Sequence, residues 1–157
     1  MKHTIKTILY VDDDQDDLDM LRGAVEATDV NFQLIEAFDG VHALELLRQM
    51  KEVNELPCLI VLDINMPRMD GKQTLAAIKR DSALRTIPVV LFSTSSSSLD
   101  KTFAFSKNVE LITKPLTVET LHAVATKLLH YCDGHLITEA LYLKRICLVK
   151  NNEQQRS

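Results

Sequence analysis

Short apolar runs alternate along the chain with stretches in which apolar residues recur every three or four positions. The runs are rich in aliphatic and β-branched residues, which is typical of strands, and the longer spacing predicts amphipathic helices. The predicted strands are residues 5–11, 32–37, 58–62, 88–92 and 109–112. The predicted helices are residues 17–27, a helix that begins at residue 40, and residues 72–80, 99–106 and 118–131.

The alternating order of these elements predicts the fold. Parallel strands joined by crossover helices form right-handed βαβ units. The uninterrupted apolar run at 58–62 indicates a strand that is covered on both faces of the sheet. We therefore predict an α/β fold with a doubly wound, five-stranded parallel sheet, flavodoxin-like, in the strand order 2-1-3-4-5.

The composition bounds the class of protein. The 157 residues are 46% hydrophobic and 25% charged, as in ordinary soluble domains. A net charge of −4 argues against a nucleic-acid partner. No apolar stretch approaches the roughly 18 residues of a membrane span, and no signal-peptide core follows the N-terminus. We expect a cytoplasmic protein without a nucleic-acid or membrane partner.

Three cysteines, Cys58, Cys132 and Cys147, are widely spaced and show no metal-ligand spacing. Because their number is odd, we predict reduced thiols that pack as small hydrophobic residues. Such thiols fit a reducing compartment.

Polar residues follow the predicted strands at the edge where a doubly wound sheet binds ligands. Neighbouring strands lie about 5 Å apart, so these side chains should converge on one pocket. Asp12 and Asp13 follow the first strand, Asp63 the third, Ser93 the fourth and Lys114 the fifth.

This set of groups suits phosphoryl transfer. Crowded carboxylates need a cation, and Mg²⁺ takes oxygen ligands while keeping water molecules. A phosphoryl group in transfer spreads charge over three oxygens, which Mg²⁺, Lys114 and Ser93 could hold while Asp63 attacks. Taken singly, such residues are often turns or helix caps. We expect Asp16 and Asp17 to cap the first helix, and Asp14 could do so too. The prediction therefore depends on their joint occurrence.

Four stretches together resemble the receiver domains of two-component response regulators. The most specific is residues 62–71, which read Leu-Asp-Ile-Asn-Met-Pro-Arg-Met-Asp-Gly. The others are Ile-Leu-Tyr-Val-Asp-Asp-Asp at 8–14, Pro-Val-Val-Leu-Phe-Ser at 88–93 and Thr-Lys-Pro at 113–115. The resemblance covers about residues 5 to 131, and we expect residues 1–131 to form a receiver domain.

The resemblance implies roles for the site residues. Asp63 would be the phosphoacceptor, and Mg²⁺ would be bound by Asp13, by Asp63 and by the backbone carbonyl of Asn65. Asp12 would act through a metal-bound water. Ser93 and Lys114 would contact the phosphoryl oxygens.

The resemblance also implies two features of the backbone and a partner. The bond between Lys114 and Pro115 is expected to be cis. Pro67 and Gly71 would shape the loop after the phosphoacceptor, since glycine can reach backbone angles closed to other residues. The phosphoryl donor would be a sensor histidine kinase or a phosphotransfer protein, and the downstream protein is unknown. The chain would catalyse only its own phosphorylation and dephosphorylation, so it is a signalling protein and no metabolic enzyme.

Two positions depart from the family pattern. Leu111 stands where Tyr or Phe is usual. In the family this ring swings inward on activation, and a leucine has no ring that could do so. Thr94 stands where Ala or Gly is usual, and its branched side chain could narrow the donor's approach.

Residues 132–157 extend beyond the usual end of a receiver domain. We expect a helix or strand there, followed by a polar, disordered tail, and no attached output domain. Its apolar residues between Leu136 and Val149 would pack on the domain itself or contact a partner or a second copy, as in a homodimer.

Two other functions stay open. A haloacid-dehalogenase-type phosphohydrolase would use Asp12 as its nucleophile, although Gln15 stands where that family has Thr or Val. A receiver could also act only as a phosphate sink.

Overall fold

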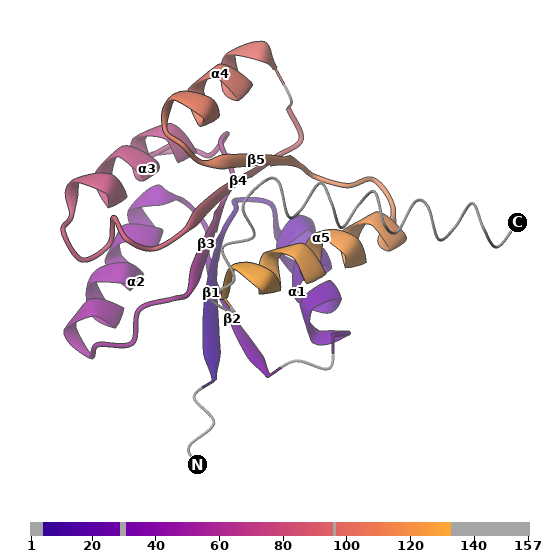
Figure 1. Ribbon diagram of the computed structural model, residues 1–157, viewed down its shortest axis with the longest axis horizontal. Helices are drawn as coiled ribbons and strands as arrows, with labels where there is room; N and C mark the ends of the chain where they lie inside the picture. The colour runs from indigo at the N-terminus through magenta and orange to yellow at the C-terminus, as the bar shows by residue number, and fades with distance from the viewer. Residues whose placement is uncertain (1–4, 29–30, 96, 133–157) are drawn as a thin grey trace, which may run out of the picture.

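A five-stranded parallel sheet lies between two layers of helices (Figure 1). The computed structural model describes residues 5–28, 31–95 and 97–132. The strand order is β2-β1-β3-β4-β5, which confirms the predicted fold class. The strands are β1 Lys6–Val11, β2 Phe32–Ala37, β3 Leu59–Leu62, β4 Val89–Ser93 and β5 Glu110–Thr113. The helices are α1 Gln15–Glu26, α2 Gly40–Glu52, α3 Gly71–Arg80, α4 Ser98–Ser106 and α5 Val118–Cys132.

Side chains alternate across the sheet and build a core on each face. Ile8 and Tyr10 of β1 pack on the side of α1 and α5. Leu9 and Val11 pack on the side of α2, α3 and α4. All residues of β3 and β4 are buried, because both strands lie in the middle of the sheet with helices on either face.

Helices α1 to α4 each begin at a side chain that caps their free N–H groups. Asp14 caps α1 by accepting hydrogen bonds from the N–H groups of Asp16 and Asp17. Those two residues therefore belong to the first turn. The prediction that they are the caps is wrong, and the alternative cap, Asp14, is confirmed. The other caps are Asp39 for α2, Asp70 for α3 and Ser97 for α4.

A disulfide joins Cys58, next to β3, to Cys132 at the end of α5. The prediction of reduced thiols at these two positions is therefore wrong. The fold brings their Cα atoms to 5.0 Å across a sequence separation of 74 residues, a pairing that spacing alone cannot reveal. Closing a loop of this length stabilises a fold by about 4 kcal/mol in the chain-entropy model.

The predicted C-terminal extension and Cys147 lie outside the described residues, apart from Cys132 itself. Within the described ranges, no helix has the length and apolar character needed to cross a membrane.

Candidate functional site

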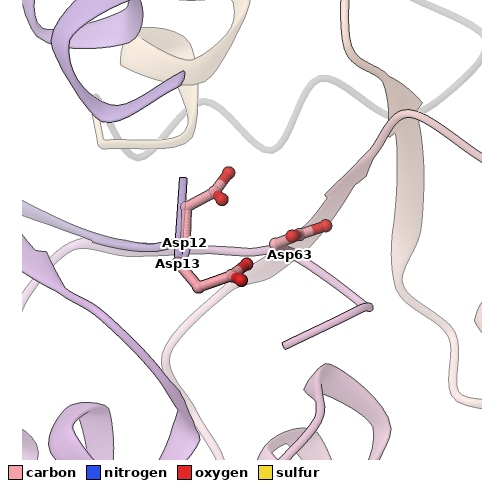
Figure 2. Close-up of side chains that lie close together, drawn as sticks. All are labelled: Asp12, Asp13 and Asp63. Carbon is pink, nitrogen blue, oxygen red and sulfur yellow. The ribbon is translucent and has the colours of Figure 1, made fainter. Parts of the chain in front are cut away.

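Three carboxylates meet where β1 and β3 end. Asp12 and Asp13 follow β1, and Asp63 follows the neighbouring strand β3, whose Leu62 pairs with Val11. One oxygen from each lies within 4.8 Å of the others. Figure 2 shows Asp12 and Asp13 leaving the chain on opposite sides, with Asp63 beside them. Three hard oxygen donors at this spacing suit a divalent cation such as Mg²⁺.

Both oxygens of Asp12 are already hydrogen-bonded within the protein. Oδ2 accepts from the Tyr10 hydroxyl at 2.7 Å and from Lys114 Nζ at 2.5 Å, and Oδ1 accepts from the N–H of Asp14 at 3.0 Å. Asp12 is fully buried, whereas Asp13 is exposed. Asp12 is thus a fixed anchor, and Asp13 is the carboxylate of the pair that faces solvent.

Asp63 is a buried carboxylate with an unusual proton affinity. Its Oδ1 accepts a hydrogen bond from the N–H of Ile64 at 2.8 Å. Burial raises the pKa of Asp63 to about 6. The charges of Asp12 and Asp13 act in the same direction, and Lys114 and the Ile64 N–H oppose them. Near neutral pH the carboxylate is ionised and only weakly compensated, so it favours a cation or an electrophile.

Lys114 supplies the positive charge of the site. Its Nζ lies 2.5 Å from Asp12, 2.7 Å from Asp17 and 3.7 Å from Asp63. Burial disfavours the ammonium, but hydrogen bonds to Asp12 and Asp17 and the charge of Asp63 outweigh burial and raise the pKa of Lys114. The lysine therefore remains protonated.

The lysine enters the pocket without a cis bond. No peptide bond in the described part of the chain is cis, so the expectation for Lys114 and Pro115 is wrong. Its backbone N–H donates to the carbonyl of Ser93 at 2.9 Å, which continues the pairing of β5 with β4. The pairing of β5 with β4 therefore places Lys114 at the pocket.

The two remaining predicted residues lie at the ends of neighbouring segments. Ser93 is the buried last residue of β4, and its Oγ accepts a hydrogen bond from the N–H of Ser95 at 3.2 Å. Asn65 is exposed, two residues beyond Asp63 in the loop before α3.

Gly71 packs directly against the main chain of Asp63. A β-carbon at Gly71 would lie 2.1 Å from the carbonyl oxygen of Asp63, and its N–H donates to the carbonyl of Ile64 at 2.8 Å. Gly71 does not use the backbone angles that are closed to other residues, because its φ lies outside the left-handed region. The residue with positive φ in this loop is Arg68, at 65°, which forms an ion pair with the buried Asp39. Position 71 requires glycine because any side chain there would collide with the main chain of Asp63.

The two departures from the family pattern occupy different environments. Leu111 is half-buried and packs into the core on the side of α2, α3 and α4. Thr94 is exposed. Phe92 packs on the opposite side, with its ring edge-on to Tyr10, and Phe105 is 88% exposed.

Sequence reasoning missed two residues of the site, Tyr10 and Asp17. Tyr10 lies two positions before Asp12, and residues so spaced point to the same face of a strand, which was the available signal. Asp17 lies one helical turn beyond the Asp14 cap, and no spacing rule connects it to Lys114.

We expect the substitution Asp63→Asn to stabilise the metal-free protein at pH 7.5 by about 2–3 kcal/mol, at about 1.36 kcal/mol per pH unit. Because the pKa of Asp63 is raised to about 6, the folded state holds the proton more tightly than the unfolded state. Stability is then lost as the pH rises from about 4 to about 6, and the gain should vanish near pH 4.

Urea unfolding in EDTA between pH 4 and 8 measures this difference, and Asp16→Asn serves as an exposed control. Parallel stability profiles for the wild-type protein and Asp63→Asn would contradict the expectation.

Comparisons with known proteins agree with this geometry. The chain matches the family described as the response regulator receiver domain over residues 8–126. Response regulator Rcp1 of Synechocystis sp. is 34% identical over 106 residues, which cover 66% of this chain and 72% of Rcp1. The probable methanogenesis regulatory protein FilR2 of Methanothrix harundinacea is 33% identical over 129 residues, covering 81% of this chain and 83% of FilR2.

Solved structures give the same result. The phosphorylated cyanobacterial phytochrome response regulator RcpA has a TM-score of 0.75 at 30% identity, covering 83% of this chain and 96% of RcpA. The Mn²⁺-bound form of Rcp1 has a TM-score of 0.71 at 29% identity, with coverages of 83% and 96%. This chain belongs to the response regulator receiver domains, and it is a signalling switch that can be phosphorylated.

Proposed function

We propose that the chain receives a phosphoryl group on Asp63 from the phosphohistidine of a sensor histidine kinase or of a phosphotransfer protein. The observation that carries this proposal is the environment of Asp63. Its buried carboxylate lies beside Asp12 and Asp13, with the Lys114 ammonium 3.7 Å away. Such a carboxylate is ionised at neutral pH and lies among groups suited to phosphoryl oxygens.

The metal of the site is proposed to be Mg²⁺. Asp13, Asp63 and the backbone carbonyl of Asn65 would hold it directly. Asp12 would act through a water, because both of its oxygens already accept hydrogen bonds. When bound, Mg²⁺ supplies positive charge to the phosphoryl oxygens. The acidic cluster and the Mn²⁺-bound Rcp1 structure support a divalent ion.

The residues of the chain have distinct parts in the transfer. A carboxylate oxygen of Asp63 attacks phosphorus, the P–N bond of the donor breaks, and its electron pair returns to the imidazole. Lys114 holds one phosphoryl oxygen and the Ser93 hydroxyl donates to another. Attack of water on phosphorus then reverses the modification. These two reactions on itself are the catalysis that we propose for this signalling protein.

A polar chain of contacts leads from the site to α4. The Ser93 hydroxyl accepts from the N–H of Ser95, whose own hydroxyl donates to Asp100 of α4 at 3.4 Å. Asp100 in turn pairs with Lys72 of α3 at 2.8 Å. If Ser93 turns toward a phosphoryl group, Ser95 loses this acceptor and the start of α4 is freed to shift. This proposed readout around α4 and β5 does not need an aromatic side chain at Leu111.

We also propose the assignments of domain and compartment. Residues 1–131 form the receiver domain, and residues 132–157 form an extension that contacts the downstream partner or a second copy. The chain works in the cytoplasm, where kinases find ATP. Because Cys58 and Cys132 form a disulfide, the predicted reduced thiols do not support a cytoplasmic location.

The two alternative functions, a phosphohydrolase and a phosphate sink, are not equally compatible with the family. Membership of the receiver family weighs against the phosphohydrolase that would use Asp12. A phosphate sink would use the same chemistry on Asp63, so it differs from a switch only in having no output partner.

We predict that acetyl phosphate labels the protein only with Mg²⁺, and that Asp63→Asn abolishes labelling because the nucleophilic oxygen is lost. Intact-protein mass spectrometry measures the label, and circular dichroism checks that the variant is folded. Labelling that survives Asp63→Asn but is lost in Asp12→Asn would favour the phosphohydrolase instead.

We predict that Asp13→Asn weakens Mg²⁺ binding more than Asp12→Asn. The reason is that Asp13 is solvent-facing, whereas the oxygens of Asp12 are taken by protein donors. Calorimetric titration of both variants with Mg²⁺ gives the comparison. Equal losses would remove the distinction between direct and water-mediated ligands.

We predict that phosphorylation changes association through residues 132–157. Light scattering of the free and beryllofluoride-loaded protein, with and without residues 133–157, measures this effect. A larger mass only for the loaded, full-length chain supports a homodimer. If removing the extension changes neither mass nor partner capture, the extension has no part in the readout.

A further inference from the structure

We propose that Asp17 is a positioning residue that competes with the phosphoryl group for Lys114. In the unphosphorylated protein it draws the ammonium away from Asp63, and the phosphorylated protein forms when Lys114 exchanges Asp17 for a phosphoryl oxygen. The inference rests on the proposed phosphorylation of Asp63, and it names a residue that sets how tightly the phosphoryl group is held.

Lys114 Nζ lies closer to Asp12 and Asp17 than to Asp63. Lys114 Nζ lies 2.5 Å from Asp12 and 2.7 Å from Asp17, both within hydrogen-bond range. It lies 3.7 Å from Asp63, which is beyond that range. The ammonium has three N–H donors, and two of them are used by these partners. These two bonds leave one N–H donor of the ammonium for a group bonded to Asp63.

The position of Asp17 separates it from the metal ligands. It lies in the first turn of α1, where its N–H donates to Asp14 at 3.4 Å, so the cap fixes this turn beside the pocket. Its oxygens are not part of the group of Asp12, Asp13 and Asp63 that lies within 4.8 Å. The side chain is 31% exposed, and among the described residues Lys114 is the donor bonded to its carboxylate, whereas Asp12 also accepts from Tyr10 and Asp14. Asp17 thus bonds to the site through Lys114.

The exchange of partners follows from charge. A bound phosphoryl group carries about −1.5 to −2 charges and strong acceptor oxygens, so it attracts Lys114 more than a single carboxylate does. Asp12 can keep its bond to the lysine, because its oxygens are buried in place by Tyr10 and Asp14. The partner that is given up is the half-exposed Asp17, which water can solvate once the lysine leaves.

The test measures the affinity of the full-length protein for beryllofluoride in the presence of Mg²⁺. Asp17→Asn, with Asp17→Ala as a second variant, should bind about three- to tenfold more tightly, as expected for removing one partly screened, charge-assisted bond. Asp16→Asn is the matched control, because it removes the same charge from the same turn without a bond to Lys114. Asp17→Glu keeps the carboxylate and should restore an affinity close to that of the wild-type protein.

A spectroscopic reading separates positioning from a general change in the fold. The ¹⁵N resonance of the Lys114 ammonium should shift in ligand-free Asp17→Asn and stay in place in Asp16→Asn. Equal beryllofluoride affinities for Asp17→Asn and Asp16→Asn, or weaker binding by Asp17→Asn, would overturn this proposal alone. Failure of the wild-type protein to bind beryllofluoride with Mg²⁺ would overturn the proposed function as well.

Discussion

The balance of charge around the Lys114 ammonium is the interaction on which the rest of the site depends. The sheet brings Asp12 and Asp63 into the protein interior at adjacent strand ends, where two carboxylates without a cation would be costly. Lys114 bonds to Asp12 and lies near Asp63, so one positive charge serves several negative ones. Burial nevertheless leaves the pKa of Asp63 raised, with the charges of Asp12 and Asp13 acting in the same direction. The excess of negative charge makes the pocket favour a divalent cation.

Some groups around Lys114 and Asp63 are packed firmly in place, and one is partly exposed. Tyr10, packed against Phe92, donates to Asp12, and burial together with Asp12 raises the pKa of the Tyr10 hydroxyl so that it stays a donor. Gly71 backs the main chain of Asp63 so closely that no larger residue fits. Asp17, by contrast, is partly exposed and holds Lys114 by a single carboxylate. The site therefore fixes the acceptor and leaves the lysine free to change partners.

The fold and the three carboxylates were predictable from the sequence because parallel strands end at one edge of a sheet, so residues after separate strands must meet there. The disulfide was not, because the approach of Cys58 to Cys132 depends on how α5 crosses β3. Nor was the bond between Asp17 and Lys114, which depends on the angle at which α1 leaves its cap. The sequence showed which strand ends carry chemistry, whereas contacts made by helices required the packing.

The partners of Lys114 also limit how far phosphorylation can shift the protein. Moving a two-state equilibrium from mostly off to mostly on requires about 5.5 kcal/mol of differential binding. A charge-assisted hydrogen bond contributes about 1.5–3 kcal/mol, but the lysine gains only the difference between the phosphoryl oxygen and Asp17. Ser93 has a similar constraint where its hydroxyl turns toward the phosphoryl group, because the bond from the N–H of Ser95 is then given up. With Leu111 in place of an aromatic side chain, these two exchanges of partner have to supply most of the bias that reaches α4.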